Sequence, residues 1–208
     1  GYCVSVSGGI DSAIALYCLV KAMDDDYDYK PIYAITTMNR TDKACGYHAQ
    51  LVIDWIKRKF PKVEIDHFMT STILDGTSKS KIGNEYCFKL FKEKKIDVWI
   101  DGVTRNPKDN SFKYIDHEDP FSVASENFRN ENLEMYKQLY EYPADKKGTG
   151  PIRIRPWANI DKKGLYEISQ KLNITGRIIV LTKSCTHRKK YKCGICWWCQ
   201  ERKWAFND

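Results

Sequence analysis

Residues 3–19, CVSVSGGIDSAIALYCL, decide how this chain folds. An apolar run typical of a buried strand breaks at Gly8-Gly9, and an apolar helical pattern begins directly after Ser12. Only small or polar residues and one isoleucine stand between the two. Ligands of open α/β sheets bind beyond the carboxyl ends of the strands. We therefore expect a binding loop at this junction.

The residues of this loop suit phosphate groups. Gly8 and Gly9 lack a Cβ, so backbone N–H groups can approach an anion closely. The next helix offers unpaired N–H groups and the positive end of its dipole, and Ser7 and Ser12 add hydroxyl donors. Asp11 would repel phosphate unless it meets backbone donors or a cation, so Mg²⁺ is its expected companion. A simple helix N-cap would use the same residue types.

Strands and helices alternate along most of the chain. Apolar patterns predict strands at 2–6, 32–36, 63–68, 98–100, 152–154 and 177–181. They predict helices at 13–23, 42–60, 75–95, 127–140 and 161–172. This alternation predicts an α/β fold, a parallel sheet with helices on both faces and right-handed crossovers.

We divide the chain into two parts. We expect residues 1–181 to form one α/β domain that binds a nucleotide at the loop described above, with an irregular or helical insertion at 103–151. We expect residues 182–208 to form a C-terminal segment, packed on that domain, that binds zinc through the cysteines described next.

Four of the eight cysteines cluster near the end of the chain. Cys185, Cys193, Cys196 and Cys199 form the pattern C-x7-C-x2-C-x2-C. Four thiolates about 2.3 Å from one ion make a closed tetrahedral Zn²⁺ site, and Gly194 suits the tight turn between two ligands. An iron–sulfur cluster is the alternative. Such clustering is typical of a reducing compartment rather than of a disulfide framework.

The positive charge is local. The chain carries a formal +7, and residues 177–203 hold eight basic residues and one acid, so that segment accounts for all of it (8 − 1 = 7). An anionic partner, nucleotide phosphate or nucleic acid, is expected there, with a solubilising surface as the alternative. No apolar run approaches the roughly 20 residues of a membrane span, and no signal peptide is visible, so we expect a cytoplasmic protein with no membrane contact.

Ser-Gly-Gly-x-Asp-Ser between a first strand and a first helix resembles the PP-loop of the ATP pyrophosphatase superfamily, which has the adenine nucleotide alpha hydrolase-like fold. These enzymes cleave ATP between its α- and β-phosphates, adenylate a substrate oxygen and release pyrophosphate. The resemblance implies a nucleotide and metal site made of Ser7, Gly8, Gly9, Asp11, Ser12 and Gly102. It implies catalytic roles for Asp11, Ser12 and Lys183.

The C-terminal motif is similar to that of 7-cyano-7-deazaguanine synthases. The similarity covers 181–185, the spacing Cys193-Gly194-x-Cys196-x-x-Cys199, Arg202 and Ala205-Phe206, and earlier Pro156-Trp157 and Asp161-Lys162-Lys163. That family makes the nitrile from 7-carboxy-7-deazaguanine for queuosine-type tRNA or DNA modification. ATP adenylates the carboxylate, ammonia displaces AMP to give the amide, and a second ATP drives dehydration. The resemblance implies ATP, Mg²⁺ and Zn²⁺ as cofactors and a possible homodimer.

Two departures put the acceptor substrate in question. Residues 39–48 keep only Gly46 and His48 of the motif that the family has after its second strand. The Tyr-Pro-Asp-Cys-Arg run that the family has in its substrate loop does not follow residues 102–107. Thr104 and Arg105 are our candidates for substrate binding. Arg105, Lys183 and Arg188 could grip a carboxylate or phosphate, while we expect ordinary structural or surface roles for His67 and His117.

Two other functions fit the sequence. The first is a PP-loop enzyme that modifies tRNA or DNA directly, using the basic C-terminal segment and its aromatic residues. The second is a non-catalytic zinc-ribbon module that binds nucleic acid. The complete set of polar residues from Ser7 to Ser12 argues against the second.

Overall fold

The computed structural model describes the chain except for residues 39–43, 72–78, 106, 108–140, 144–148 and 186–192. Its strands are β1 (Tyr2–Ser5), β2 (Ile32–Met38), β3 (Ile65–Ser71), β4 (Val98–Asp101), β5 (Glu141–Pro143) and β6 (Ile152–Ile154). Its helices are α1 (Ile10–Asp26), α2 (Ala44–Lys59), α3 (Lys79–Lys92), α5 (Lys162–Lys171), α6 (Thr175–Leu181) and α7 (Trp197–Phe206).

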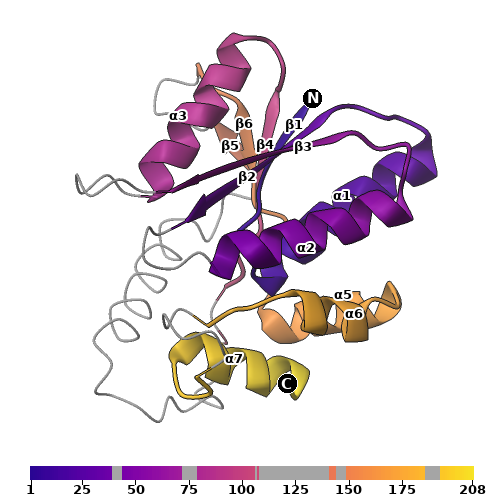
Figure 1. Cartoon of the computed structure of the whole chain (residues 1–208), viewed down its shortest axis with the longest axis vertical. Coiled ribbons are helices and arrows are strands. Elements are labelled where there is room, and N and C mark those ends of the chain that lie inside the picture. Colours follow the sequence, from indigo (N-terminus) through magenta and orange to yellow (C-terminus); the bar gives the residue numbers. More distant parts are fainter. Residues whose placement is uncertain (39–43, 72–78, 106, 108–140, 144–148, 186–192) are drawn as a thin grey trace.

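The strands form one sheet in the order β3-β2-β1-β4-β6-β5. The first five in that order are parallel, and β5 is antiparallel to β6 at the edge. Tyr2 of β1 pairs with Ile32 of β2 and with Val98 of β4, so the first strand lies in the middle of the sheet. Helices α1 and α2 cover one face and α3 covers the other (Figure 1), which confirms the predicted fold class.

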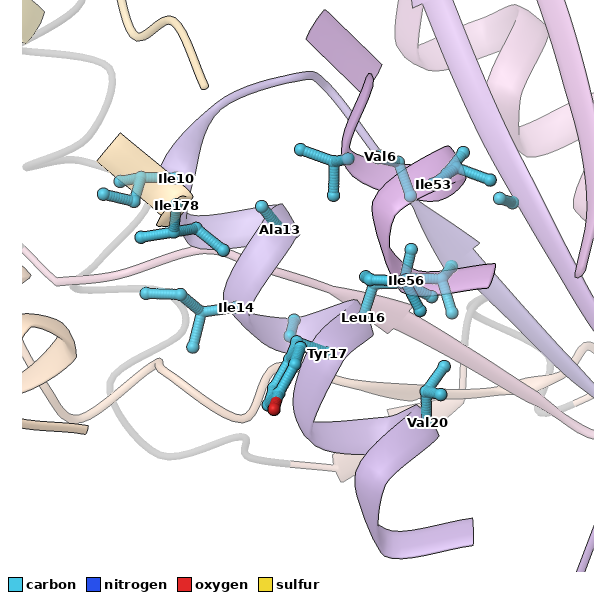
Figure 2. Packing of buried hydrophobic residues seen from close by; sticks show 14 of the residues in the cluster. Val6, Ile10, Ala13, Ile14, Leu16, Tyr17, Val20, Ile53, Ile56 and Ile178 are labelled. Carbon is cyan, nitrogen blue, oxygen red and sulfur yellow. The ribbon is translucent and has the colours of Figure 1, made fainter. Parts of the chain in front are cut away.

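The larger core lies between the sheet and α1 (Figure 2). Ile10, Ile14 and Tyr17 of α1 are buried, together with residues of β1, α2 and α6. The ring of Tyr17 also stacks on Trp55 of α2, with 5.3 Å between the centroids. Because α1 is packed on several sides, its N-terminus is held firmly at the end of β1. This packing fixes the position of the loop between them.

A smaller core lies under α3 and pairs two cysteines that the sequence shows only as scattered residues. The Sγ atoms of Cys3 in β1 and Cys87 in α3 are 2.9 Å apart and buried. The hydrogen bond to the Cys87 thiol and burial both raise the pKa of Cys3. The Cys3 thiol therefore stays protonated, and the two buried cysteines pack as small apolar side chains.

One predicted element is wrong in type. Residues 177–181 lie in helix α6 and not in a strand. The apolar run reads as a strand, but Ile174, Ile178 and Leu181 are buried at helical spacing while Val180 is 70% exposed. Packing against the α1 side of the core decided this element. The short strand β5 was not predicted, and the helix predicted at 127–140 lies outside the described residues.

The remaining predicted strands and helices are present, with boundaries shifted by a few residues. Within the described ranges, no helix combines the length and apolar character that a membrane crossing requires.

Candidate functional site

The loop of residues 7–12 leaves β1 and enters α1 with a backbone that needs glycine. Gly8 has a φ of +75°, and a Cβ there would collide with the carbonyl oxygen of Cys45. Gly9 is the N-cap of α1 and makes no side-chain cap hydrogen bond. The first N–H groups of the helix are therefore left without a side-chain cap, which suits an anion.

Two serine hydroxyls hold the shape of the loop. The backbone N–H of Ser7 donates to Ser12 Oγ (3.1 Å), and the two hydroxyl oxygens are also 3.1 Å apart. Ser12 Oγ donates to the carbonyl of Gly9 (3.1 Å), whose N–H donates to Ser7 Oγ (3.3 Å). Both serines predicted for the phosphate site thus lie in one hydrogen-bonded turn.

Asp11 is held by groups from distant parts of the chain. Its Oδ2 accepts from Lys162 Nζ at 2.9 Å and from Thr104 Oγ1 at 3.4 Å. Its backbone carbonyl accepts from Trp157 Nε1 at 3.1 Å. Its Oδ1 is buried and, among the described residues, has no hydrogen-bond partner. An unsatisfied buried carboxylate oxygen is costly unless a further donor or a cation meets it.

Lys162 and Glu201 are the site residues that sequence reasoning missed. Lys162, only 3% exposed, also lies 2.9 Å from Glu201 Oε2, and Glu201 is fully buried. The available signal was the position of a lysine on the same helical face as Leu165 and Ser169, which are buried in α5. Its partners lie 151 and 39 positions away, and no local pattern reveals them.

Of the other residues predicted to bind nucleotide or substrate, Gly102 and Thr104 lie next to Asp11. A Cβ on Gly102 would lie 2.6 Å from backbone atoms of Asp11 and Ser12, so β4 ends directly against the loop. Thr104 is buried and reaches Asp11 as described above. Arg105 donates its backbone N–H to Ile160, and its buried Nε has no hydrogen-bond partner in the described part of the chain.

The segment after α6 returns to the loop. The backbone N–H of Lys183 donates to the carbonyl of Gly8 at 2.9 Å, and the Lys183 side chain is buried. His48 Nδ1 donates to the carbonyl of Leu181 at 2.8 Å, which ties the start of α2 to the end of α6. The backbone of Lys183 therefore adjoins the loop, and its catalytic role stays a prediction. Arg188 falls outside the described residues.

The four clustered cysteines converge on one point. Their Sγ atoms all lie within 4.8 Å of one another, with 3.9 Å between Cys193 and Cys199 and 4.0 Å between Cys185 and Cys196. Gly194 has a φ of +76°, as its place in the tight turn requires. The hydrogen bond with the Cys185 thiol and burial raise the pKa of Cys199 to about 11. These sulfurs form a metal site whose loading must release protons.

Helix α7 connects this metal site to the rest of the fold. Cys196 is its N-cap, and Cys199 lies in its first turn. The buried guanidinium of Arg202 donates to the carbonyls of Thr182 (2.9 Å) and Ile179 (2.6 Å). These are carbonyls at the end of α6, so Arg202 caps that helix. Arg202 was noted in the sequence only as part of a motif. In the structure it joins α7 to the extended segment after α6, where Lys183 donates to the carbonyl of Gly8.

A cavity of about 250 Å³ adjoins Ser7 between the sheet and α3. Asp101 at the end of β4 lines it, held by the guanidinium of Arg153, which lies 4.0 Å from the ring centroid of Trp99. Trp99 Nε1 in turn donates to Ser5 Oγ at 2.9 Å. These contacts fix polar side chains on one side of the cavity, next to the loop of residues 7–12.

The two single histidines play no visible part in this site. His67 is bonded on both ring nitrogens, to Thr36 Oγ1 (2.8 Å) and Gln50 Oε1 (2.9 Å), and burial together with the charge of Lys57 lowers its pKa. It is a structural residue between β2, β3 and α2, as expected. His117 lies outside the described residues.

Comparisons with known proteins bear on the fold. No family model matches the chain, and no curated protein matches it. A solved structure that resembles it is the U34-tRNA thiolase NcsA from Methanococcus maripaludis with its [4Fe-4S] cluster, with a TM-score of 0.50 and 13% sequence identity. The match covers 99% of this chain, which spans only 64% of the length of that protein. The likeness shows the fold alone, and nothing in it supports the 7-cyano-7-deazaguanine synthase family in particular.

The close approach of Gly102 to the loop gives a test of this geometry. Gly102→Ala should destabilise the protein by about 1–3 kcal/mol, because the new methyl group meets backbone atoms that cannot move away. Gly176→Ala is the matched control, since nothing lies within 4 Å of its Cβ position in α6. It should be neutral or stabilise by up to about 1 kcal/mol. Urea unfolding of both variants measures the difference, and equal stabilities would contradict the packing described.

Proposed function

We propose that this protein is an ATP-dependent adenylating enzyme that forms AMP and pyrophosphate. The observation that carries the proposal is the environment of Asp11, which lies in the first turn of α1 directly after the glycine pair. One of its carboxylate oxygens is buried and has no hydrogen-bond partner among the described residues. A loop that served only as a helix cap would have no use for that oxygen. A loop that binds a triphosphate with its Mg²⁺ would use it as a metal ligand.

Local charge supports the same reading. Asp11, Lys162 and Glu201 carry −1, +1 and −1, so the three groups sum to −1 in a largely buried position. A divalent cation offsets this charge and neutralises part of the charge of a triphosphate. In this proposal Ser7, Gly8, Gly9 and Ser12 hold the phosphates, and Asp11 holds Mg²⁺, which screens the charge on the α-phosphate. Lys183 contributes to stabilising the leaving pyrophosphate.

We propose a carboxylate as the acceptor, as in the conversion of a 7-carboxy-7-deazaguanine-like acid with ammonia. A carboxylate oxygen attacks the α-phosphorus, and the bond to pyrophosphate breaks. Ammonia then attacks the acyl carbon and AMP leaves, giving the amide, which a second ATP could activate toward the nitrile. The cavity beside Ser7, which Arg153 lines, supports a small anionic acceptor. Arg105, which does not line this cavity, has a buried Nε without a hydrogen-bond partner among the described residues. The protein's task in these steps is positioning and charge stabilisation.

The products of ATP turnover test the proposal. Incubation with ATP, Mg²⁺, ammonia and 7-carboxy-7-deazaguanine should give AMP, pyrophosphate and a product lighter than the acid. Mass spectrometry should show the small loss expected for the amide, or the further loss of one water expected for the nitrile. Asp11→Asn should lower the rate at least about a hundredfold, because it removes charge at the transferred phosphate. Asp25→Asn, on the exposed side of α1, is the matched control and should be fully active. Release of ADP and phosphate would contradict adenylation.

We propose zinc for the four-cysteine site. A tetrahedron with bonds of about 2.3 Å separates its thiolates by about 3.8 Å, close to the 3.9 and 4.0 Å between paired sulfurs here. A cubane cluster needs wider spacing, because each cysteine binds a different iron. Four thiolates leave no open position, so the ion supplies structure to α7 rather than chemistry.

Metal analysis distinguishes the two kinds of site. We expect one zinc per chain, lost in Cys199→Ser and retained in Cys18→Ser, a half-buried cysteine far from the cluster in sequence. Loss of zinc should lower the melting temperature, since metal binding stabilises the folded segment. Iron with acid-labile sulfide and visible absorption would instead establish an iron–sulfur cluster.

A second candidate function is direct modification of tRNA. It is favoured by the fold likeness to a protein described as a tRNA thiolase and by the basic residues of 177–203. Trp197 is buried and cannot stack on bases, which leaves Trp198 for that role. Binding of tRNA that weakens steeply between about 50 and 200 mM salt would support this function. Absence of binding at the lower salt concentration would exclude it.

A further inference from the structure

Three side chains from three helices meet behind the phosphate loop. Lys162 of α5 lies 2.9 Å from Asp11 Oδ2 in α1 and 2.9 Å from Glu201 Oε2 in α7. Their side chains are 17%, 3% and 0% exposed in the order Asp11, Lys162, Glu201. Glu201 is thus too deep to touch a ligand, and its ion pair with Lys162 connects it to the loop.

We propose that Glu201 is a positioning residue for the nucleotide site: it holds Lys162 so that the carboxylate of Asp11 stays available to the Mg²⁺ that accompanies ATP. The inference rests on the proposed function, since it assumes that the loop binds MgATP. It assigns a role to a residue that no sequence motif singled out.

The shared ammonium explains why a second carboxylate is needed. With Glu201 present, Lys162 bonds one oxygen of Asp11, and the other remains unbonded among the described residues. Without it, the whole charge of a buried ammonium faces Asp11 and competes with a metal ion for that carboxylate. The sum of the three charges also changes from −1 to 0, which weakens the attraction for a cation at low dielectric.

The structure also shows why Glu201 stays in place. Arg202, the next residue, hydrogen bonds the end of α6, and Cys199 two residues earlier belongs to the four-cysteine site. Glu201 is therefore fixed from both sides, and its distance from Lys162 is set by the position of α7. A mobile carboxylate could not keep Lys162 in ion pairs with both Asp11 and Glu201.

The test is a Mg²⁺ titration of nucleotide binding, which needs no turnover. Binding of α,β-methylene-ATP to the full chain is measured by calorimetry at increasing Mg²⁺. We expect Glu201→Gln to raise the Mg²⁺ concentration for half-saturation about tenfold, the usual size of coupling between buried neighbours. Glu167→Gln is the matched control, an exposed glutamate on α5, and should leave it unchanged. Glu201→Asp, which keeps the charge, should recover most of the effect.

A double-mutant cycle tests whether Glu201 acts through Lys162. In a Lys162→Gln background, adding Glu201→Gln leaves no buried charged pair to break, and the cycle isolates the coupling. Because Glu201 acts through Lys162, this second change should shift the half-saturating Mg²⁺ less than about twofold. A shift as large as in the native background would overturn the proposal, as would a Glu201→Gln variant that titrates like Glu167→Gln.

The outcomes separate the two proposals. Native protein that binds no nucleotide at any Mg²⁺ concentration would overturn the proposed function, and this inference with it. If the native protein binds the nucleotide and the Glu201 variants need the same Mg²⁺ concentration for half-saturation as the native protein, only the role of Glu201 would be overturned.

Discussion

The ammonium of Lys162, buried between two carboxylates, is the constraint on which the site depends. A charge in the interior must be paired, because its desolvation is otherwise too costly. Lys162 can only be buried if Asp11 and Glu201 both reach it, and each comes from a different helix. The folding of α1, α5 and α7 is thereby tied to one arrangement around the phosphate loop. A structure with any of the three helices displaced would leave a charge unpaired.

Hydrogen bonds from the C-terminal part add a second, independent connection. Arg202 caps α6, His48 binds the same helix end, and Lys183 bonds the carbonyl of Gly8. The metal-bearing segment therefore contributes directly to the shape of the loop, and Phe206 at its end lies in the main core. The boundary drawn in the sequence at residue 181 separates parts that share their hydrogen bonds and their apolar contacts.

What the sequence could predict was decided by local pattern. Alternating strands and helices, the glycine loop and the spacing of the four cysteines each depend on a few neighbouring residues, and each was found. The errors have a common cause in tertiary contacts. Residues 177–181 are helical because Ile178 and Leu181 face the core. Lys162 was noted only as part of a family motif, and its ion pairs were not predicted because its partners are far away in the chain. The pairing of Cys3 with Cys87 likewise spans 84 positions.

The four clustered sulfurs have a structural role that reaches Asp11 through helix α7. A single ion bound by four thiolates has no position open to substrate, so such a site can affect chemistry only through the structure it holds. Here that structure is α7, which begins at Cys196 and carries Glu201 just over one turn later. The path from the metal site to the nucleotide loop then needs only three side chains, Glu201, Lys162 and Asp11. The four-cysteine site at the end of the chain in this way supports the side chains that hold Asp11, although it contacts neither phosphate nor acceptor in the proposed reaction.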